Sequence, residues 1–398
     1  MDMYLVINLI SQQLLPNVIP TLSLKSNVKK VYLVLAGNAF KHQADRLQQF
    51  YRDNGIDDIE VVQCQDPNDY YLLRQEAKGL FKDIKTRFPD DFITLNSSGG
   101  TKPMSFAFTQ EFDNLPEKSM AIYTDTLNKK VTILNDADGL PDLPYRSVLD
   151  IENYLRLNGF IADCWIDKHC KSHDEIVSRY DLSQALIKAA NQTRQPISAL
   201  NAICQTSNFS QKGKEFQPSV DMQYPPSNEL KTLLYLAVNH GLITWHNNSV
   251  TFTSEEAASY LGGVWLEELA YIAANEADIE HVALSLKGHQ INKKHSQQED
   301  NVTNELDVVL VNNNQMMIIE AKTVNWERNG SGQNVTLKLD SLTSALGGPF
   351  AKGLLASALK FNQTTLDRLR NKSNLTPYQV TSYQALLNHL KEWKVTTQ

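Results

Sequence analysis

The chain has 398 residues, 42% of them apolar and 21% charged, a composition ordinary for a globular protein of two or three domains. Its formal net charge of −7 excludes a global attraction to nucleic acid, so any contact with a polyanion must come from a local group of cations or from a metal. Its four cysteines form no paired framework and no stretch reaches membrane-spanning length, which favours a cytoplasmic protein without a membrane segment.

The N-terminal third alternates between strand-like and helix-like segments. Strands are expected at Tyr4–Ile10, Val31–Leu35, Ile59–Cys64, Phe92–Leu95, Ala121–Thr124 and Lys130–Leu134. Helices are expected at Phe40–Arg52, at Asn68–Arg87 and from Pro103 through Phe112. Such alternation predicts an α/β domain with a parallel sheet and helices on both faces.

A polar loop follows the fourth expected strand. Its hydroxyls, flexible glycine backbone and cation suit an anionic ligand, and they belong to Ser97, Ser98, Gly99, Gly100, Thr101 and Lys102. The spacing is neither that of a Walker P-loop nor that of a dinucleotide fingerprint. The alternative is a plain turn between strand and helix. Ser11 and Gln12 after the first strand, and Asn38 after the second, are expected at the same carboxyl edge, where open α/β sheets bind ligands.

The middle of the chain changes character. Helices are expected at Ile151–Leu157, Ser183–Ala190 and Asn228–Asn239, with a polar loop at Gln205–Ser227. A hairpin with an Asn247-Asn248 turn follows the last helix, and helix plus hairpin resembles a winged-helix module. Because that helix lacks a dense Lys/Arg face, we favour a structural connector over a DNA reader.

The sharpest signal lies in the stretch NELDVVLVNNNQMMIIEAKT. Two apolar strands flank an Asn-rich turn, and a turn centred between Asn313 and Asn314 places Asp307 opposite Glu320. Side chains alternate along a strand, so Glu320 and Lys322 share one face. Two carboxylates and one ammonium then converge on a small volume. The alternative is an exposed hairpin with a Glu–Lys surface pair.

Carboxylate oxygens suit a hard divalent cation, Mg²⁺ or Mn²⁺, which would polarise a phosphodiester and lower the pKa of water. Lys322 would hold the attacking water or stabilise charge on the phosphorane. A helix beginning near Gly262 carries two further carboxylates, of which Glu267 is the better candidate for the site and Glu268 the second. Glu305 shares a strand face with Asp307 and is a candidate outer-shell ligand of the metal.

Several motifs together resemble one family, the CRISPR-associated ancillary nucleases that join a CARF (CRISPR-associated Rossmann fold) domain to a PD-(D/E)xK nuclease domain. The resemblance spans nearly the whole chain. It rests, in this order, on Ser11-Gln12, Asn96–Lys102, Trp265–Glu268, Glu305–Asp307, Glu320–Lys322, and Leu346–Gly348 before a helix expected near Ala351.

The resemblance implies a Rossmann-like CARF domain over residues 1–148, a helical and winged-helix-like connector over 149–258, and a restriction-endonuclease-like α/β domain over 259–398. It implies that the loop residues bind a cyclic oligoadenylate, with the tetra-adenylate favoured, across a homodimer. It also implies a Glu on the helix before the hairpin, which makes Asp307, Glu320 and Glu267 the expected metal ligands.

The function expected from these features is a ligand-activated, metal-dependent endonuclease that cleaves DNA or RNA in type III CRISPR antiviral defence. One alternative is a ligand-sensing transcription regulator with an inactive C-terminal domain. Another is a ring nuclease whose CARF domain degrades its own activator.

Overall fold

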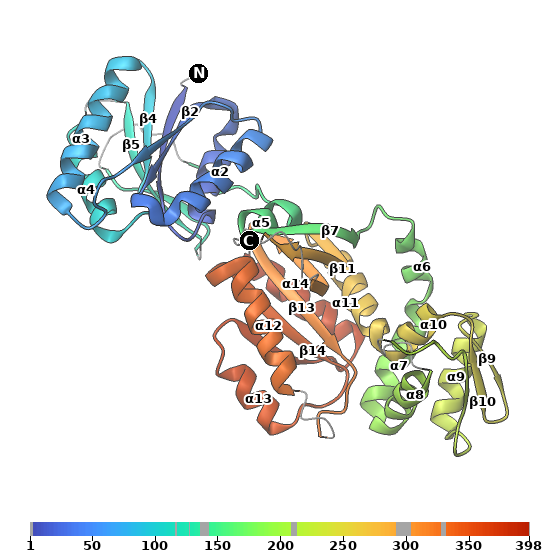
Figure 1. The fold of residues 1–398 in the computed structure, drawn as a ribbon. Coiled ribbons are helices and arrows are strands. Elements are labelled where there is room, and N and C mark those ends of the chain that lie inside the picture. The colour runs from blue at the N-terminus through green and yellow to red at the C-terminus, as the bar shows by residue number, and fades with distance from the viewer. Residues whose placement is uncertain are drawn as a thin grey trace. The chain divides into compact units, whose positions relative to one another are not determined.

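The computed structural model describes residues 3–115, 118–126, 128–135, 143–207, 213–291, 304–327 and 332–397. The chain divides into two compact units, Met1–Gly159 and Phe160–Gln398, and each is described by itself (Figure 1). The domain boundaries at residues 148 and 258 remain predictions. Among the described residues, no helix combines the length and the apolar character needed to cross a bilayer.

The N-terminal unit is built on a six-stranded sheet in the order β3-β2-β1-β4-β5-β6. Its strands are β1 (Tyr4–Ile10), β2 (Val28–Leu35), β3 (Ile59–Gln63), β4 (Phe92–Asn96), β5 (Ser119–Asp125) and β6 (Lys130–Ile133). The first five run parallel, and β6 pairs antiparallel with β5. All seven residues of β1 are buried, as expected of a central strand covered on both faces. The predicted α/β fold with its parallel sheet is confirmed.

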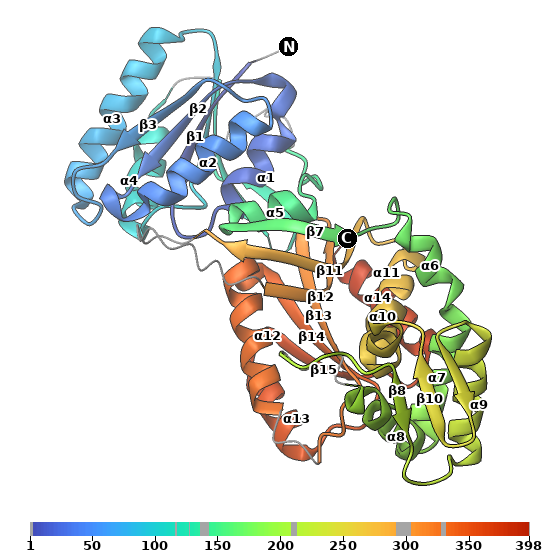
Figure 2. The same cartoon turned by 45° about the vertical axis from the view of Figure 1, so that its right-hand side comes forward.

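Helices cover both faces of this sheet (Figure 2). They are α1 (Leu15–Ser23), α2 (Lys41–Asp53), α3 (Tyr70–Arg87), α4 (Lys102–Phe112) and α5 (Ile151–Leu157). Apolar side chains of α3 and α4 form one core with β1, β2 and β4. Helix α1 was not predicted, and it contains two prolines, Pro16 and Pro20, a residue that usually interrupts helices. Pro16 lies in the first turn, where a missing N–H costs nothing, and all nine residues of α1 are buried.

The C-terminal unit contains a second six-stranded sheet, in the order β15-β14-β13-β12-β11-β7. Its strands are β7 (Phe160–Ile166), β11 (His281–Gln290), β12 (Asn304–Asn312), β13 (Gln315–Lys322), β14 (Ala351–Ser357) and β15 (Leu375–Gln379). β7, β11, β12 and β13 pair antiparallel, whereas β13, β14 and β15 run parallel. The edge strand β7 comes from the segment predicted as connector.

Four helices flank the second sheet: α11 (Trp265–Glu276), α12 (Gly332–Gly347), α13 (Gln363–Arg370) and α14 (Tyr383–Thr397). The helix expected near Ala351 is wrong, since Ala351–Ser357 is strand β14. Six of its seven residues are buried, so the run is apolar on both faces and has no helical period. The helix that crosses over to β14 is α12, which lies before it in the chain.

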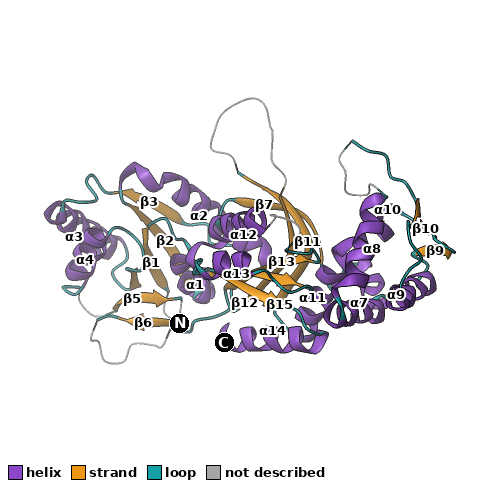
Figure 3. Cartoon of the chain, turned by 90° about the horizontal axis from the view of Figure 1, so that it is seen from below, coloured by secondary structure: helices purple, strands orange, loops and turns teal. Residues whose placement is uncertain are grey.

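A smaller helical module continues the core of α11. It comprises α6 (Ser172–Ser178), α7 (Tyr180–Gln192), α8 (Arg194–Thr206), α9 (Asn228–Asn239) and α10 (Glu255–Ser259), with strands β8 (Ser219–Asp221), β9 (Ile243–His246) and β10 (Ser249–Phe252). Figure 3 shows α7, α8 and α9 beside these short strands. The predicted helix Asn228–Asn239 and the hairpin after it are confirmed. The expected loop Gln205–Ser227 is not entirely loop, because α8 extends into its start and β8 lies within it.

Candidate active site and ligand-binding edge

The hairpin formed by β12 and β13 has the predicted register. Val308 pairs with Ile319, and the pairing runs without a shift to the turn. Asn313 and Asn314 form that turn with φ of 44° and 61°, the left-handed values that a two-residue hairpin loop needs and that asparagine tolerates. Since the register is continuous, Asp307 and Glu320 lie one position farther from the turn than the pair Val308–Ile319, on neighbouring strands.

Lys322 joins these two carboxylates. Its ammonium donates to Asp307 Oδ2 at 3.1 Å and lies 2.8 Å from Glu320 Oε1. The Ala321 N–H donates to the same Asp307 oxygen at 2.8 Å. The Asp307 and Glu320 side chains are only 10% and 3% exposed. The structure therefore places two of the expected catalytic carboxylates within ion-pair distance of the third expected residue, Lys322.

Burial dominates the electrostatics of this cluster. It raises the pKa of Asp307, and repulsion from Glu320 adds to the effect, which outweighs the attraction of Lys322. Burial alone would lower the pKa of Lys322, but Asp307 and Glu320 reverse this and the net pKa is raised. Lys322 thus stays charged at neutral pH between the two carboxylates.

The adjacent carboxylates at the start of α11 have different partners. Burial raises the pKa of Glu267 well above its ordinary range, and the next largest cause is the negative charge of Asp307. Glu268 instead accepts from Arg179, with Nη2 at 2.5 Å and Nε at 3.2 Å. Glu268 is thus paired with Arg179, whereas Glu267 is the carboxylate that is affected by the charge of Asp307.

A second lysine, which sequence reasoning missed, reaches the cluster from α12. Lys338 Nζ lies 3.4 Å and 3.5 Å from the two oxygens of Glu320. Its helix was detectable, because Val335, Leu339, Leu342 and Leu346 recur at helical spacing. No short motif links a lysine there to the hairpin, so its contact with Glu320 could be seen only in three dimensions.

The expected ligand-binding loop lies at the switch point of the first sheet. The strand order places β2 and β3 on one side of β1, and β4 and β5 on the other. The loops after β1 and β4 therefore flank the crevice where such sheets bind ligands. At Gly99 an added Cβ would lie 2.0 Å from the Leu9 carbonyl oxygen, so only glycine allows this approach of the loop to strand β1. Gly100 has a φ of +78°.

The three loop hydroxyls already have protein partners. Ser97 donates to the Ile122 carbonyl at 3.1 Å, and Ser98 donates to Asn96 Oδ1 at 2.6 Å. Thr101 donates to the Pro67 carbonyl at 2.8 Å and caps α4. These hydroxyls fix the shape of the loop, which leaves backbone groups and Lys102 as its freest contacts for a ligand.

Beneath the loop lies a network of amide side chains buried to 0% exposure: Asn8, Asn17 and Asn96. Asn96 Nδ2 donates to Asn8 Oδ1 at 3.1 Å and to the Pro16 carbonyl at 2.8 Å. Asn8 Nδ2 lies 3.1 Å from both Thr21 Oγ1 and Tyr51 Oη. This network ties β4, and with it the loop, to β1, α1 and α2. Sequence reasoning missed it, although asparagines inside apolar strands are unusual enough to signal it.

The other expected ligand-binding residues lie at the same carboxyl edge. Ser11 and Gln12 directly follow β1, and Gln12 Oε1 accepts from Gln43 at 3.0 Å. Asn38 follows β2, with its Oδ1 accepting from Gln63 at 3.0 Å. The edge therefore gathers neutral polar groups that are held by neighbouring side chains.

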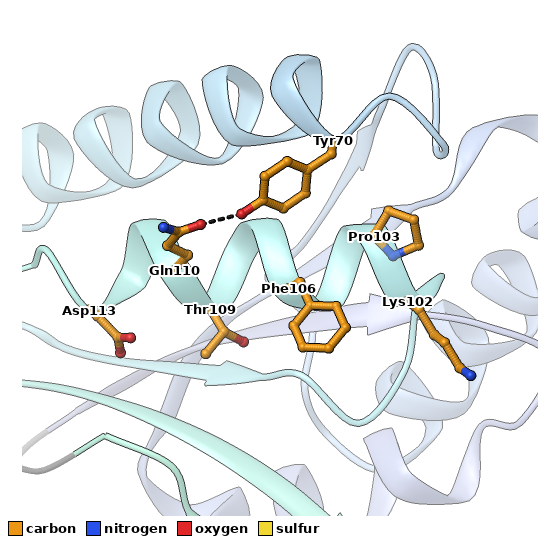
Figure 4. A pocket seen from close by; sticks show the side chains of 7 residues that line it. All are labelled: Tyr70, Lys102, Pro103, Phe106, Thr109, Gln110 and Asp113. Atoms are coloured by element: carbon orange, nitrogen blue, oxygen red, sulfur yellow. Dashed lines mark hydrogen bonds between the residues drawn. The ribbon is translucent and has the colours of Figure 1, made fainter.

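Lys102 begins α4, and its side chain is exposed. Figure 4 shows Lys102 and Phe106 on the same side of this helix, while Gln110 of α4 meets Tyr70 at the start of α3. These residues line an open groove of about 710 Å³, and Phe106 is 70% exposed. A cation and an unusually exposed aromatic ring thus lie side by side next to the loop.

Comparison with known proteins assigns both ends of the chain. Residues 5–154 match the Card1 CARF domain, and residues 254–397 match the Card1-like endonuclease domain. The chain belongs to the Card1-type CARF endonucleases. This confirms the resemblance to CRISPR-associated ancillary nucleases and makes the chain a nuclease. A search of curated proteins found no match.

Two solved structures share the fold of this CARF endonuclease over its whole length. Protein VC1899 from Vibrio cholerae is 21% identical, with a TM-score of 0.82, and the alignment covers 99% of this chain and 98% of that one. Can2 from Sulfobacillus thermosulfidooxidans, solved in complex with cyclic tetra-adenylate, is 23% identical, with a TM-score of 0.73 and coverage of 98% and 99%.

The side chains of this CARF endonuclease fit a divalent cation by their chemistry. Asp307, Glu320 and Glu267 offer the oxygen donors that Mg²⁺ and Mn²⁺ prefer. Burial, and after it the neighbouring carboxylates, raise the pKa values of Asp307 and Glu267 despite Lys322, so a cation beside them would favour their charged forms. Across the described residues no group of three or more acidic, His or Cys side chains stands ready to hold a metal ion.

Proposed function

We propose that this CRISPR endonuclease is switched on by a cyclic oligoadenylate, with the tetra-adenylate favoured, and hydrolyses DNA or RNA phosphodiesters with Mg²⁺ or Mn²⁺. The observation that carries the catalytic part is the joining of two buried carboxylates by Lys322 on one hairpin. The endonuclease match supports the reaction, and the CARF match supports the activator. The ring bound to Can2 supports the preference for the tetra-adenylate.

At the catalytic site, Asp307 and Glu320 hold the cation from the hairpin and Glu267 completes the set from α11. The bound cation would polarise the scissile phosphate and make water more acidic. Lys322 remains protonated beside them because the carboxylates raise its pKa. Its ammonium can stabilise the negative charge that develops on the phosphoryl oxygens.

At the sensor site, Lys102 and the backbone N–H groups of Gly99 and Gly100 bind phosphates of the ring. Ser11, Gln12 and Asn38 contact its riboses or base edges, while Ser97, Ser98 and Thr101 act mainly by shaping the loop. A ring with rotational symmetry can be gripped by two copies of one loop related by a two-fold axis. We therefore propose a homodimer, and the exposed Phe106 beside Lys102 supports a second copy packing next to the ring site.

The decisive experiment is a cleavage assay on labelled single-stranded and duplex DNA and RNA, run with Mg²⁺ or Mn²⁺ and with or without cyclic tetra-adenylate or hexa-adenylate. We expect cleavage that needs both the ring and the metal and that stops with EDTA. Glu320→Gln should abolish it, whereas the matched control Asp278→Asn should not, because Asp278 is exposed and pairs only with Lys394 among the described residues.

Each other result contradicts a named part of the proposal. Cleavage unaffected by Glu320→Gln or by EDTA contradicts the metal-dependent site. Degradation of the cyclic oligoadenylate itself in the absence of metal would indicate a ring nuclease instead. Ring binding and sequence-specific DNA binding without any cleavage assign a transcription regulator.

A further inference from the structure

Lys338 is the basic side chain at the catalytic cluster that the proposed chemistry leaves without a role. It projects from α12, the helix that packs over β13 and β14. Glu320 lies beneath it, only 3% exposed, whereas the Lys338 side chain is 46% exposed. The ammonium of Lys338 therefore stands between the buried carboxylate and solvent.

The two lysines that reach Glu320 are not equivalent. Lys322 lies at 2.8 Å from Glu320 and also contacts Asp307, so it is held from two sides. Lys338 lies at 3.4 Å at its nearest and has no other charged partner in the described ranges. A long, half-exposed contact of this kind costs little to break. Lys338 can thus turn outward, while Lys322 cannot leave the cluster without unpairing a buried carboxylate.

Two polar, uncharged side chains share the exposed face of α12 that carries Lys338. Asn334 and Ser341 lie four residues before and three residues after it, so they share its face of α12, and both are exposed. The nearby acid on the same helix, Asp340, is paired with Lys372 at 2.6 Å. Lysine, asparagine and serine side chains are the groups that proteins use to contact the nucleic-acid backbone.

We propose that Lys338 binds a backbone phosphate of the substrate strand next to the scissile bond and so positions that strand over Asp307 and Glu320. Lys338 is a positioning residue for the substrate and takes no part in the bond-breaking step. Asn334 and Ser341 extend the same contact along the backbone. This inference rests on the proposed function, since it presumes that a nucleic acid is the substrate.

The test compares Lys338→Ala with the matched control Lys352→Ala. Lys352 is an exposed lysine at the far end of β14, where it donates to the Ser373 carbonyl at 3.4 Å. Binding of a labelled oligonucleotide is measured with the ring present, in EDTA, over a range of salt concentrations. Cleavage is measured with the ring and Mn²⁺, with kcat and KM separated.

For Lys338→Ala we expect binding weaker by about 10-fold and a salt-dependence slope reduced by about 1, as for loss of one phosphate contact. KM should rise while kcat at saturating substrate changes by less than about 3-fold. Lys338→Arg should restore most of the binding, because it keeps the charge. Lys352→Ala should match the wild type in every measurement.

Two results for Lys338→Ala would overturn the inference. A lower kcat with an unchanged salt-dependence slope would place Lys338 in the chemical step. Unchanged binding and cleavage with altered thermal stability would mean that Lys338 only balances the charge of Glu320. Failure of the proposed function looks different. Wild-type protein would then bind the oligonucleotide without cleaving it, and the slope change in Lys338→Ala would still be seen.

Discussion

The loop after β4 and the hairpin of β12 and β13 both bury polar side chains, but in opposite ways. Beneath the loop, Asn8 and Asn96 are neutral amides whose hydrogen bonds are made within the protein. At the hairpin, Asp307 and Glu320 are like charges that share one lysine. A network of neutral hydrogen bonds can hold the loop above it in one shape, whereas buried like charges favour a bound cation. The difference fits the roles proposed for the two regions, which are ligand recognition at the loop and chemistry at the hairpin.

The largest effect should come from removing charge at the hairpin. Asp307→Asn keeps the shape of the side chain but weakens both the cation site and the pairing with Lys322. We expect cleavage to fall by at least about 100-fold, more than loss of an outer partner of a metal ligand. Ring binding, measured by calorimetry, should stay unchanged. Equal losses of ring binding and cleavage would show that the two regions are not separate sites.

Damage to the amide network should destabilise one unit selectively. Asn96→Ala removes the donor to Asn8 and Pro16 and the acceptor for Ser98, and leaves buried groups without partners. We expect the N-terminal unit to lose about 2–3 kcal/mol of unfolding free energy, with no change in the C-terminal unit. Denaturant unfolding followed by hydrogen exchange of each unit distinguishes them. A uniform loss across both units would contradict the comparison.

Removal of the loop cation should change affinity and spare chemistry. Lys102→Ala should weaken cyclic tetra-adenylate binding by about 1.5–3 kcal/mol per site, the cost of one charge-assisted contact. The activation curve should shift to higher ring concentration, while saturating ring restores the cleavage rate. Lys78→Ala, an exposed lysine on α3, is the control. Normal ring binding combined with lost cleavage would mean that the loop belongs to the nuclease reaction.

The smallest effect should be a gain in stability at the catalytic site. Burial and Asp307 raise the pKa of Glu267 well above its ordinary value, so at neutral pH this carboxyl group opposes folding in the absence of metal. Glu267→Gln should raise the melting temperature of metal-free protein by about 2–4 °C, equivalent to about 1 kcal/mol, while reducing cleavage. A melting temperature lower than that of the wild type in EDTA would contradict this account.

The pH dependence of that gain follows from the direction of the shift. A carboxyl whose folded pKa is raised binds more protons in the folded state than in the unfolded state. Wild-type stability therefore rises as the pH falls from the folded pKa of Glu267 toward its lower unfolded pKa, and the advantage of Glu267→Gln shrinks over that window. Thermal melts at a series of pH values in EDTA measure the crossover.

The sequence predicted best those features that depend on local order. The register of the catalytic hairpin follows from an Asn-Asn turn and alternation, and both are local. Glu267 was preferred to the adjacent Glu268 by resemblance to a family. The different surroundings of the two carboxylates depend on Arg179, which is far away in the chain and pairs with Glu268. The contact of Lys338 and the amide network were not predicted for the same reason. Their partners lie on other helices and strands, and contacts between distant elements leave no periodic pattern in the sequence.

The end of the first unit depends on one glycine. Helix α5 ends at Leu157 and strand β7 begins at Phe160, so Asn158 and Gly159 are the only residues between them. Arg46 donates to the Leu157 carbonyl at 2.9 Å, and an added Cβ on Gly159 would lie 2.6 Å from the same guanidinium. Any other residue at position 159 would therefore displace the side chain that holds the end of α5.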